Sequence, residues 1–216
     1  MLMSTNGDSG GDNYRWAPLL ISQARLSPYL KSNKDIGSAL NYYSNDLQKT
    51  ADLYQWLSFF EVTLRNALFG CLSEIGKGSG DDFDPFTHIW PDLTPQGRGE
   101  LSLAIKSILN RGIPVSPDRI VSELHFGFWR FLLASRYEST LWTQHLRHGF
   151  TNLKPQSRSV AYDAIESINT IRNRVAHHKT LKGKSIEREV ELIKEVLGWI
   201  SIDALNWAES QLPHAN

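Results

Sequence analysis

Cysteine and long apolar runs are what this sequence most obviously lacks. Cys71 is the only cysteine among 216 residues, which excludes an intrachain disulfide and a zinc site of several thiolates, and fits a reducing compartment. No run reaches the ~18 apolar residues of a membrane-spanning helix, and the polar start lacks the basic and apolar parts of a signal peptide. We therefore expect a cytoplasmic protein without membrane contact, in which residues 1–13 form a disordered tail.

Net charge is lacking too, because 23 Lys and Arg balance 23 Asp and Glu. A neutral chain has no global field that would draw it onto nucleic acid, so any such contact must come from a local patch. One stretch can supply that patch, since no acidic residue lies between Asn173 and Ser185. Its candidate RNA-binding residues are Arg174, His178, Lys179, Lys182 and Lys184.

Strand patterns are missing as well, because no series of alternating apolar and polar residues is joined by hairpin turns. Every long periodic segment has the helical repeat instead, which predicts one all-α domain over residues 14–212, a bundle of about six or seven helices. The main helical segments are expected at Pro18–Leu30, with a candidate early end at Ser27-Pro28, and at Asp35–Ile75, Pro95–Asn110, Pro155–Ala176 and Ile186–Trp207. An aromatic-rich segment with helical spacing is expected over Asp118–Leu146. Glycine, serine and proline predict one long surface excursion over Gly76–Pro85 and Trp90–Gly99.

Apolar stripes at helical spacing indicate which faces are buried. In the long second segment the stripe consists of Leu53, Leu57, Phe60, Leu64, Leu68, Cys71 and Ile75. In the segment that ends at Ala176 it consists of Val160, Ala164, Ile168, Ile171 and Val175. The last segment steps by fours and threes, a pattern typical of packing inside a bundle, through Ile186, Val190, Ile193, Leu197, Ile200, Ala204 and Trp207. Large rings are expected in the core rather than on a base-stacking surface at Phe126, Phe128, Trp129, Phe131, Tyr137 and Trp142.

Residues suited to acid–base chemistry gather where the helical segment ending at Ala176 gives way to the basic loop. The apolar stripe places Asn173 and His177 one turn apart on the opposite side, where they can touch, and Arg172 flanks the stripe. An arginine offers a fork of donors to charge building on phosphate oxygens, and an imidazole, with an ordinary pKa of about 6.5, can take or deliver a proton near neutral pH. These groups suffice to cut RNA without metal, by attack of the ribose 2′-OH on the adjacent phosphorus. A symmetric dimer would supply a second histidine, so dimerisation belongs to this hypothesis.

Four segments together resemble the Abi-like family of phage abortive-infection proteins, which belongs to the HEPN superfamily. They are Arg172–His178, with the Arg-x4-His motif and an asparagine after the arginine, and Glu61–Asn66, Glu123–Trp129 and Tyr137–Trp142. The resemblance covers roughly residues 25–207. It implies a HEPN-like helical bundle that forms a homodimer and cleaves RNA without metal to leave a cyclic phosphate, in antiphage defence or as a toxin.

Carried over position by position, the motif implies that Arg172 stabilises the phosphate or the transition state. It implies that Asn173 gives polar support and that His177 transfers the proton, with His178 as a weaker stand-in. On the long helical segment Glu61 and Arg65 stand one turn apart as an ion pair, and Arg65 with Asn66 is a candidate support for the active helix or lining of an RNA groove.

Other interpretations stay open beside the nuclease. The chain is alternatively a non-catalytic module that binds RNA or a partner protein through the same surface, or its last helix mainly drives assembly. A toxin role leaves an RNA or protein antitoxin open as a further partner. No spacing of His, Cys or acidic residues indicates a metal or cofactor site, and His125, which follows Arg119 at a looser spacing, is expected to pack in the core.

Overall fold

The computed structural model describes residues 14–33, 35–76, 84–181 and 183–213. The expected tail over residues 1–13 and the candidate RNA-binding Lys182 lie outside these ranges. Within them the chain forms helices and no strand, which confirms the all-α class. None of the helices in these ranges combines the length and the apolar composition that crossing a membrane requires.

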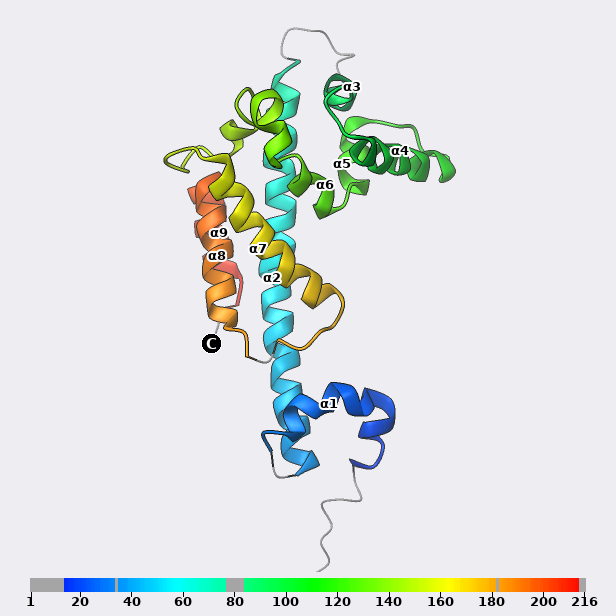
Figure 1. The fold of residues 1–216 in the computed structure, drawn as a ribbon, viewed down its shortest axis with the longest axis vertical. Coiled ribbons are helices and arrows are strands. Elements are labelled where there is room, and N and C mark those ends of the chain that lie inside the picture. The colour runs from blue at the N-terminus through cyan, green and yellow to red at the C-terminus, as the bar shows by residue number, and fades with distance from the viewer. Residues whose placement is uncertain (1–13, 34, 77–83, 182, 214–216) are drawn as a thin grey trace, which may run out of the picture.

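The central element is α2 (Ile36–Glu74). Its 39 residues extend over about 58 Å at the rise of an α-helix, and Figure 1 shows it running through most of the length of the molecule. Asp35 caps its start by accepting a hydrogen bond from the Ser38 amide at 2.8 Å. The predicted stripe is confirmed as buried at Leu53, Leu57, Phe60, Leu64 and Leu68, and as partly buried at Cys71 and Ile75.

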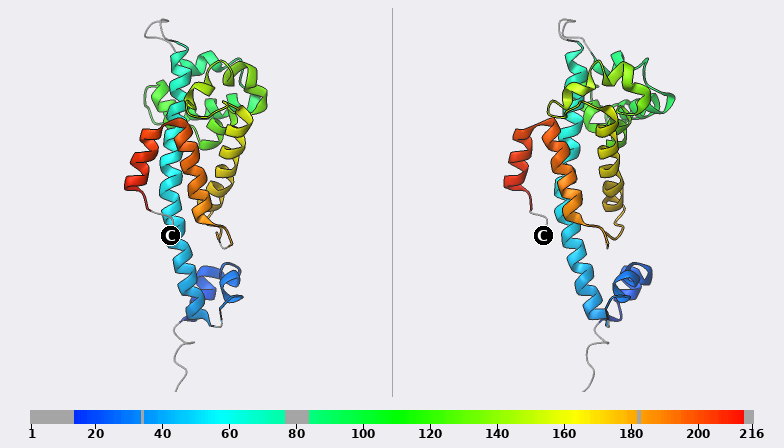
Figure 2. Two further views of the ribbon diagram at one scale, coloured as in Figure 1. Left: turned by 90° about the vertical axis from the view of Figure 1, so that its left-hand side faces the viewer. Right: turned by 60° about the vertical axis from the view of Figure 1, so that its left-hand side comes forward.

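Two helices, α7 (Arg158–Ala176) and α8 (Ile186–Ile200), pack against α2, as Figures 1 and 2 show. Ser157 caps α7 by accepting a hydrogen bond from the Val160 amide, so this helix begins slightly later than expected. Its buried face consists of Ala161, Ile165, Ile168, Ile171 and Val175. The expected burial of Val160 is wrong, because at the first turn the buried position is Ala161 and the Val160 side chain is 45% exposed.

The expected single helix from Ile186 to Trp207 is also wrong. Its backbone is extended at Ser201, whose hydroxyl accepts a hydrogen bond from the Ala204 amide and so caps a new helix, α9 (Ile202–Gln211). This helix folds back beside α8 (Figure 2). Trp207 therefore lies on a different helix from Ile186, with its ring 5.1 Å from that of Phe59 between centroids.

The chain between α2 and α7 folds into short helices around the C-terminal end of α2 (Figure 1). They are α3 (Pro85–Ile89), α4 (Pro95–Asn110), α5 (Pro117–Glu123), α6 (Phe126–Phe131) and three shorter turns. The bounds of α4 are those expected. The expected surface excursion is partly wrong, because Pro85 and Leu93, which belong to it, are buried; its residues 77–83 lie outside the described ranges. The described residues thus contain more helices, α1 to α9, than the sequence predicts.

The core interpretation of the aromatic residues is confirmed. One of the six named rings, Phe131, is partly buried against the same core. The other five are each at most 5% exposed: Phe126, Phe128, Trp129, Tyr137 and Trp142. They bring α6 and the following turns onto α2, where Phe60 and Phe126 have ring centroids 6.0 Å apart. Burial therefore excludes a base-stacking role for the five buried rings.

An N-terminal arm packs on the first part of α2, outside the bundle of α7, α8 and α9 (Figures 1 and 2). The arm consists of a π-helical turn, Pro18–Ser22, and α1 (Gln23–Leu30). Pro28 lies inside α1, so the helix does not end early at Ser27-Pro28. Leu26 and Tyr29 are the buried side chains of α1, and they fix the arm near the loop that follows α7.

Candidate functional site

Helix α7 ends in a turn that fixes the backbone of His177 and of the neighbouring His178. The amide of His178 donates to the carbonyl of Val175 at 3.0 Å and that of Lys179 to the carbonyl of Arg174 at 2.8 Å, the hydrogen-bond pattern of a Schellman motif. His178 occupies the left-handed position of this motif with a φ of 51°, where glycine is usual. His177 is the C-cap, and its side chain is exposed. The end of α7 is thus a defined turn rather than a frayed terminus.

Arg172 reaches from α7 to α2. Its Nε donates to Oε1 of Glu61 at 2.8 Å, and the two side chains are 34% and 26% exposed. Within the described residues no acceptor takes Nη2 of this guanidinium. The expected ion pair between Glu61 and Arg65 is wrong, because the carboxylate turns to the cation of the neighbouring helix. A half-buried pair of this kind fixes the orientation of a guanidinium that still has a donor for a ligand.

A groove of about 930 Å³ lies along α2 beside this ion pair. One wall is α2 from Leu47 to Arg65, a distance of about 27 Å at the rise of an α-helix, and the end of α7 supplies Arg172, Val175, Ala176 and His178. Arg65 and Arg172 give the groove two cations against the one carboxylate of Glu61. Exposed apolar surface comes from Leu47, Tyr54 and Val62.

The structure brings together only some of the residues expected at the site. Arg172, Glu61, Arg65 and His178 line one groove, whereas the other candidates lie outside its lining. The exposed ones are Asn66, Asn173, His177, Lys179 and Lys184. The expected contact of Asn173 with His177 is replaced by contacts of the Asn173 amide with Asn169 at 3.3 Å and with Arg172 at 3.4 Å.

Arg174 has a structural role that the sequence did not indicate. Its Nη2 donates to the carbonyl of Thr180 at 2.5 Å, and its Nε is buried without a hydrogen-bond partner in the described part of the chain. A guanidinium used in this way holds the backbone of the loop. It is therefore less accessible to RNA than the exposed Lys179 and Lys184.

The sequence predicts only part of the α2 wall of the groove: Arg65 lines it as expected and Asn66 does not, and the rest of the wall was missed. Tyr54, Ser58 and Glu61 recur at steps of four and three on the side of α2 that borders its buried stripe, which is a signal of a common helix face. Nothing in that spacing shows that α7 lies beside this face. The contact between the two helices is made by residues far apart in the sequence, such as Glu61 and Arg172, which are 111 positions apart.

The RNA contact expected from the sequence can be tested in this groove by replacing Glu61 with glutamine, which should strengthen RNA binding if RNA lies there. The substitution removes the carboxylate that offsets Arg172, so one more phosphate can be neutralised in the groove. For a single strand, the slope of log K against log salt should then become steeper by about 0.7. Filter-binding titrations at several salt concentrations measure this slope.

The matched control is Glu195→Gln, the same change of charge at an exposed position of α8 outside the groove. It should leave the slope unchanged. An equal slope for Glu61→Gln and wild type would show that RNA does not occupy the groove beside Arg172.

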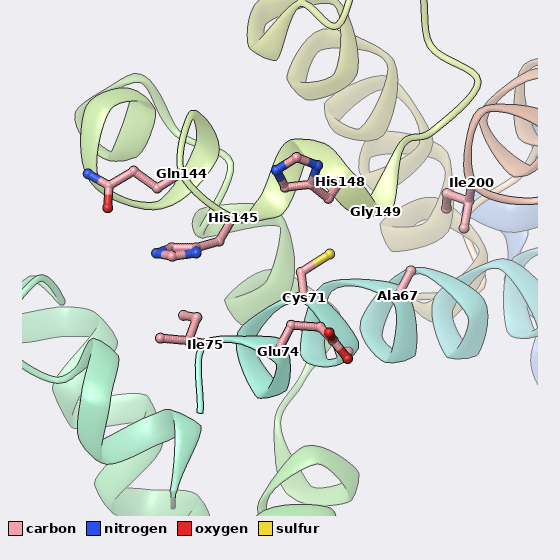
Figure 3. Close-up of a pocket in the computed structure, with 10 residues that line it drawn as sticks. Ala67, Cys71, Glu74, Ile75, Gln144, His145, His148, Gly149 and Ile200 are labelled. Atoms are coloured by element: carbon pink, nitrogen blue, oxygen red, sulfur yellow. The ribbon is translucent and has the colours of Figure 1, made fainter. Parts of the chain in front are cut away.

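A second pocket, of about 700 Å³, lies near the C-terminal end of α2 (Figure 3). Burial, followed by the charge of Glu74, raises the pKa of the Cys71 thiol to about 11, so this side chain is a protonated thiol and not a nucleophile near neutral pH. Burial and the neighbouring His88 and His148 lower the pKa of His145. In the described ranges, no three His, Cys, Asp or Glu side chains gather as a possible metal site.

The looser pair of Arg119 and His125 belongs to neither pocket. Arg119 donates to the carbonyl of Pro114 at 2.5 Å and so holds the chain that enters α5. His125 precedes α6 as its N-cap residue, and its side chain is exposed. The expected burial of His125 in the core is therefore wrong, because the cap position lies at the surface while the next residue, Phe126, enters the core.

Relationships to known proteins give no further guide to the site. Comparisons of the chain with protein-family models, with curated proteins and with solved structures find no match.

Proposed function

We propose that this chain is a metal-independent endoribonuclease of HEPN type, with its reaction centre at the α7 end of the groove. The observation that carries the proposal is the half-buried pair of Arg172 and Glu61, which holds a guanidinium in the same groove as His178. The resemblance to Abi-like proteins supports a reaction centre at the same end of α7. A role in antiphage abortive infection, or as a toxin with an RNA or protein antitoxin, is proposed from that resemblance alone.

In the proposed reaction the ribose 2′-OH attacks the adjacent phosphorus. A base takes the 2′-OH proton as the new P–O bond forms, the P–O5′ bond breaks, and an acid protonates the leaving 5′-oxygen. The products are a 2′,3′-cyclic phosphate and a 5′-OH. Arg172 donates from Nη2 to the phosphate oxygens, where negative charge builds up in the transition state, while Glu61 keeps the guanidinium in place.

Two imidazoles are needed, one as base and one as acid, and we propose that a homodimer supplies them. His178 lines the groove of its own chain, whereas His177 is exposed outside it. In a symmetric dimer His177 of each copy would act on the RNA held by the other copy. Asn173, exposed beside Arg172, would support the phosphate or the imidazole. A monomer in sedimentation analysis under assay conditions would contradict this arrangement.

A non-catalytic binding module is the second candidate function. The observation that favours it is the apolar surface in the groove, where the side chains of Leu47, Tyr54 and Val62 are at least 42% exposed. Such a surface suits a protein partner as well as RNA bases. A protein that only binds RNA or a partner would need Arg172 for its affinity. It would cleave nothing, so it would not depend on the two histidines for proton transfer.

Substitution of the histidines distinguishes the two functions. With RNA in excess EDTA, His177→Ala and His178→Gly should each lower the cleavage rate by about 10²- to 10⁴-fold while RNA affinity changes little. Glycine is chosen at position 178 because it suits the left-handed backbone there, so the turn persists. If both variants cut RNA like wild type, the proton-transfer assignment is wrong. If wild type binds RNA without cutting it, the binding module is the better account.

A further inference from the structure

The loop that carries the two histidines is held by the N-terminal arm, more than 150 positions away in the sequence. Nη1 of Arg25 on α1 donates to the carbonyl of His178 at 2.6 Å. One turn further along α1, the hydroxyl of Tyr29 lies 2.9 Å from the hydroxyl of Thr180. The arm therefore contacts the backbone and a side chain of the segment directly after α7.

A carboxylate on α2 completes these contacts. Asp46 Oδ2 accepts hydrogen bonds from Tyr29 at 2.5 Å and from Thr180 at 3.2 Å, so three side chains from three parts of the chain form a closed triangle. Tyr29 is only 3% exposed. Its burial and the hydrogen bond to Asp46 raise the pKa of the phenol to about 12, and Tyr29 thus remains a donor throughout the neutral range.

These contacts hold the loop at its two ends, at His178 and at Thr180. Arg25 bonds to His178, the residue with the left-handed backbone, which is the least favourable conformation in the turn for a side chain other than glycine. Thr180 is held twice, through its hydroxyl by the arm and through its carbonyl by Arg174. The direction of the imidazole of His178 depends on the backbone between these two anchors.

We propose that Arg25, Tyr29 and Asp46 are positioning residues, which form a latch that fixes residues 178–180 and thereby aims the imidazole of His178 at the groove. Only the catalytic role of His178 rests on the proposed function. The contacts of the latch themselves belong to the fold and do not depend on it. None of the three residues lines the groove. Their effect on RNA is therefore exerted through the loop.

Hydrogen exchange of the full-length protein tests the latch without any assumption about activity. Tyr29→Phe and Arg25→Ala should each accelerate exchange of the protected amides of His178, Lys179 and Lys184 by about 2- to 10-fold, the effect of one lost hydrogen bond. Exchange in α8 and in the middle of α2 should not change. Tyr43→Phe is the matched control, because the ring of Tyr43 packs edge-on against Tyr29 at 5.5 Å but lies outside the triangle. Arg25→Lys, which keeps a donor, should restore part of the protection.

Cleavage kinetics test the consequence for the site. Tyr29→Phe and Arg25→Ala should lower kcat by about 2- to 10-fold with KM nearly unchanged, because a misaimed imidazole affects the reaction more than RNA binding. Unchanged exchange in both variants would overturn the latch, and faster exchange with an unchanged kcat would overturn its positioning role. If wild type cuts no RNA, the proposed nuclease fails, whereas the exchange result still decides whether the arm holds the loop.

Discussion

Replacing Arg172 with alanine is expected to lower the rate of RNA cleavage by about 10²- to 10³-fold, the usual effect of removing one donor that stabilises charge in a transition state. The guanidinium is the group that Glu61 fixes within the groove, and no other described arginine of the groove lies on α7. Arg172→Lys should keep most of the RNA affinity and lose most of the rate, because an ammonium lacks the planar fork of donors.

Two controls make this result specific. Arg188→Ala removes the same charge from an exposed position at the start of α8 and should cut RNA like wild type. Arg172→Ala should unfold close to the wild-type temperature, since a partly exposed ion pair contributes only ~0.2 to 1 kcal/mol. If folded Arg172→Ala protein cleaves RNA at the wild-type rate, the guanidinium does not stabilise the transition state.

Replacing Phe60 with alanine is expected to cost about 3 to 5 kcal/mol of the free energy of unfolding, because it opens a cavity in the core. Phe60 is fully buried in the middle of α2 and packs against Phe126, so it joins the central helix to the region of short helices. For a chain of this size the loss corresponds to a fall in Tm of about 6 to 20 °C. Thermal unfolding followed by circular dichroism or calorimetry measures it.

Tyr54→Ala on the same helix is the matched control for Phe60. Its side chain is 59% exposed, and alanine is the best helix former, so the free energy of unfolding should stay within about 0.5 kcal/mol of wild type. A loss below about 1 kcal/mol for Phe60→Ala would show that α2 does not form the centre of the core.

Several elements could be predicted from the sequence because local chemistry determines them. Helix α4 has the expected bounds, since Thr94 caps its start and Pro95 occupies its first turn. The long α2 follows from one continuous apolar stripe. The prediction of one helix from Ile186 to Trp207 was wrong for an equally local reason. The hydroxyl of Ser201 caps a new helix there, although the apolar pattern continues past this residue.

The candidate site could be predicted only in part. Arg172 and the histidines stand out in the sequence, but the partner of Arg172 is on another helix, and nothing local shows that Glu61 faces it. Which histidine enters the groove depends on the left-handed backbone of His178, a consequence of the turn and not of residue spacing. The contact of Arg25 with that same residue is equally remote in the sequence.

The most direct test of the central claim is the product formed by wild-type protein from single-stranded and structured RNAs in excess EDTA. Once a cut is mapped, the same strand is made with a single 2′-deoxy nucleotide on the 5′ side of that position. The account predicts 2′,3′-cyclic phosphate and 5′-OH ends from RNA, and no cut at the deoxy position. RNA that stays intact with folded, dimeric protein, or a cut that persists without the 2′-OH, would contradict it.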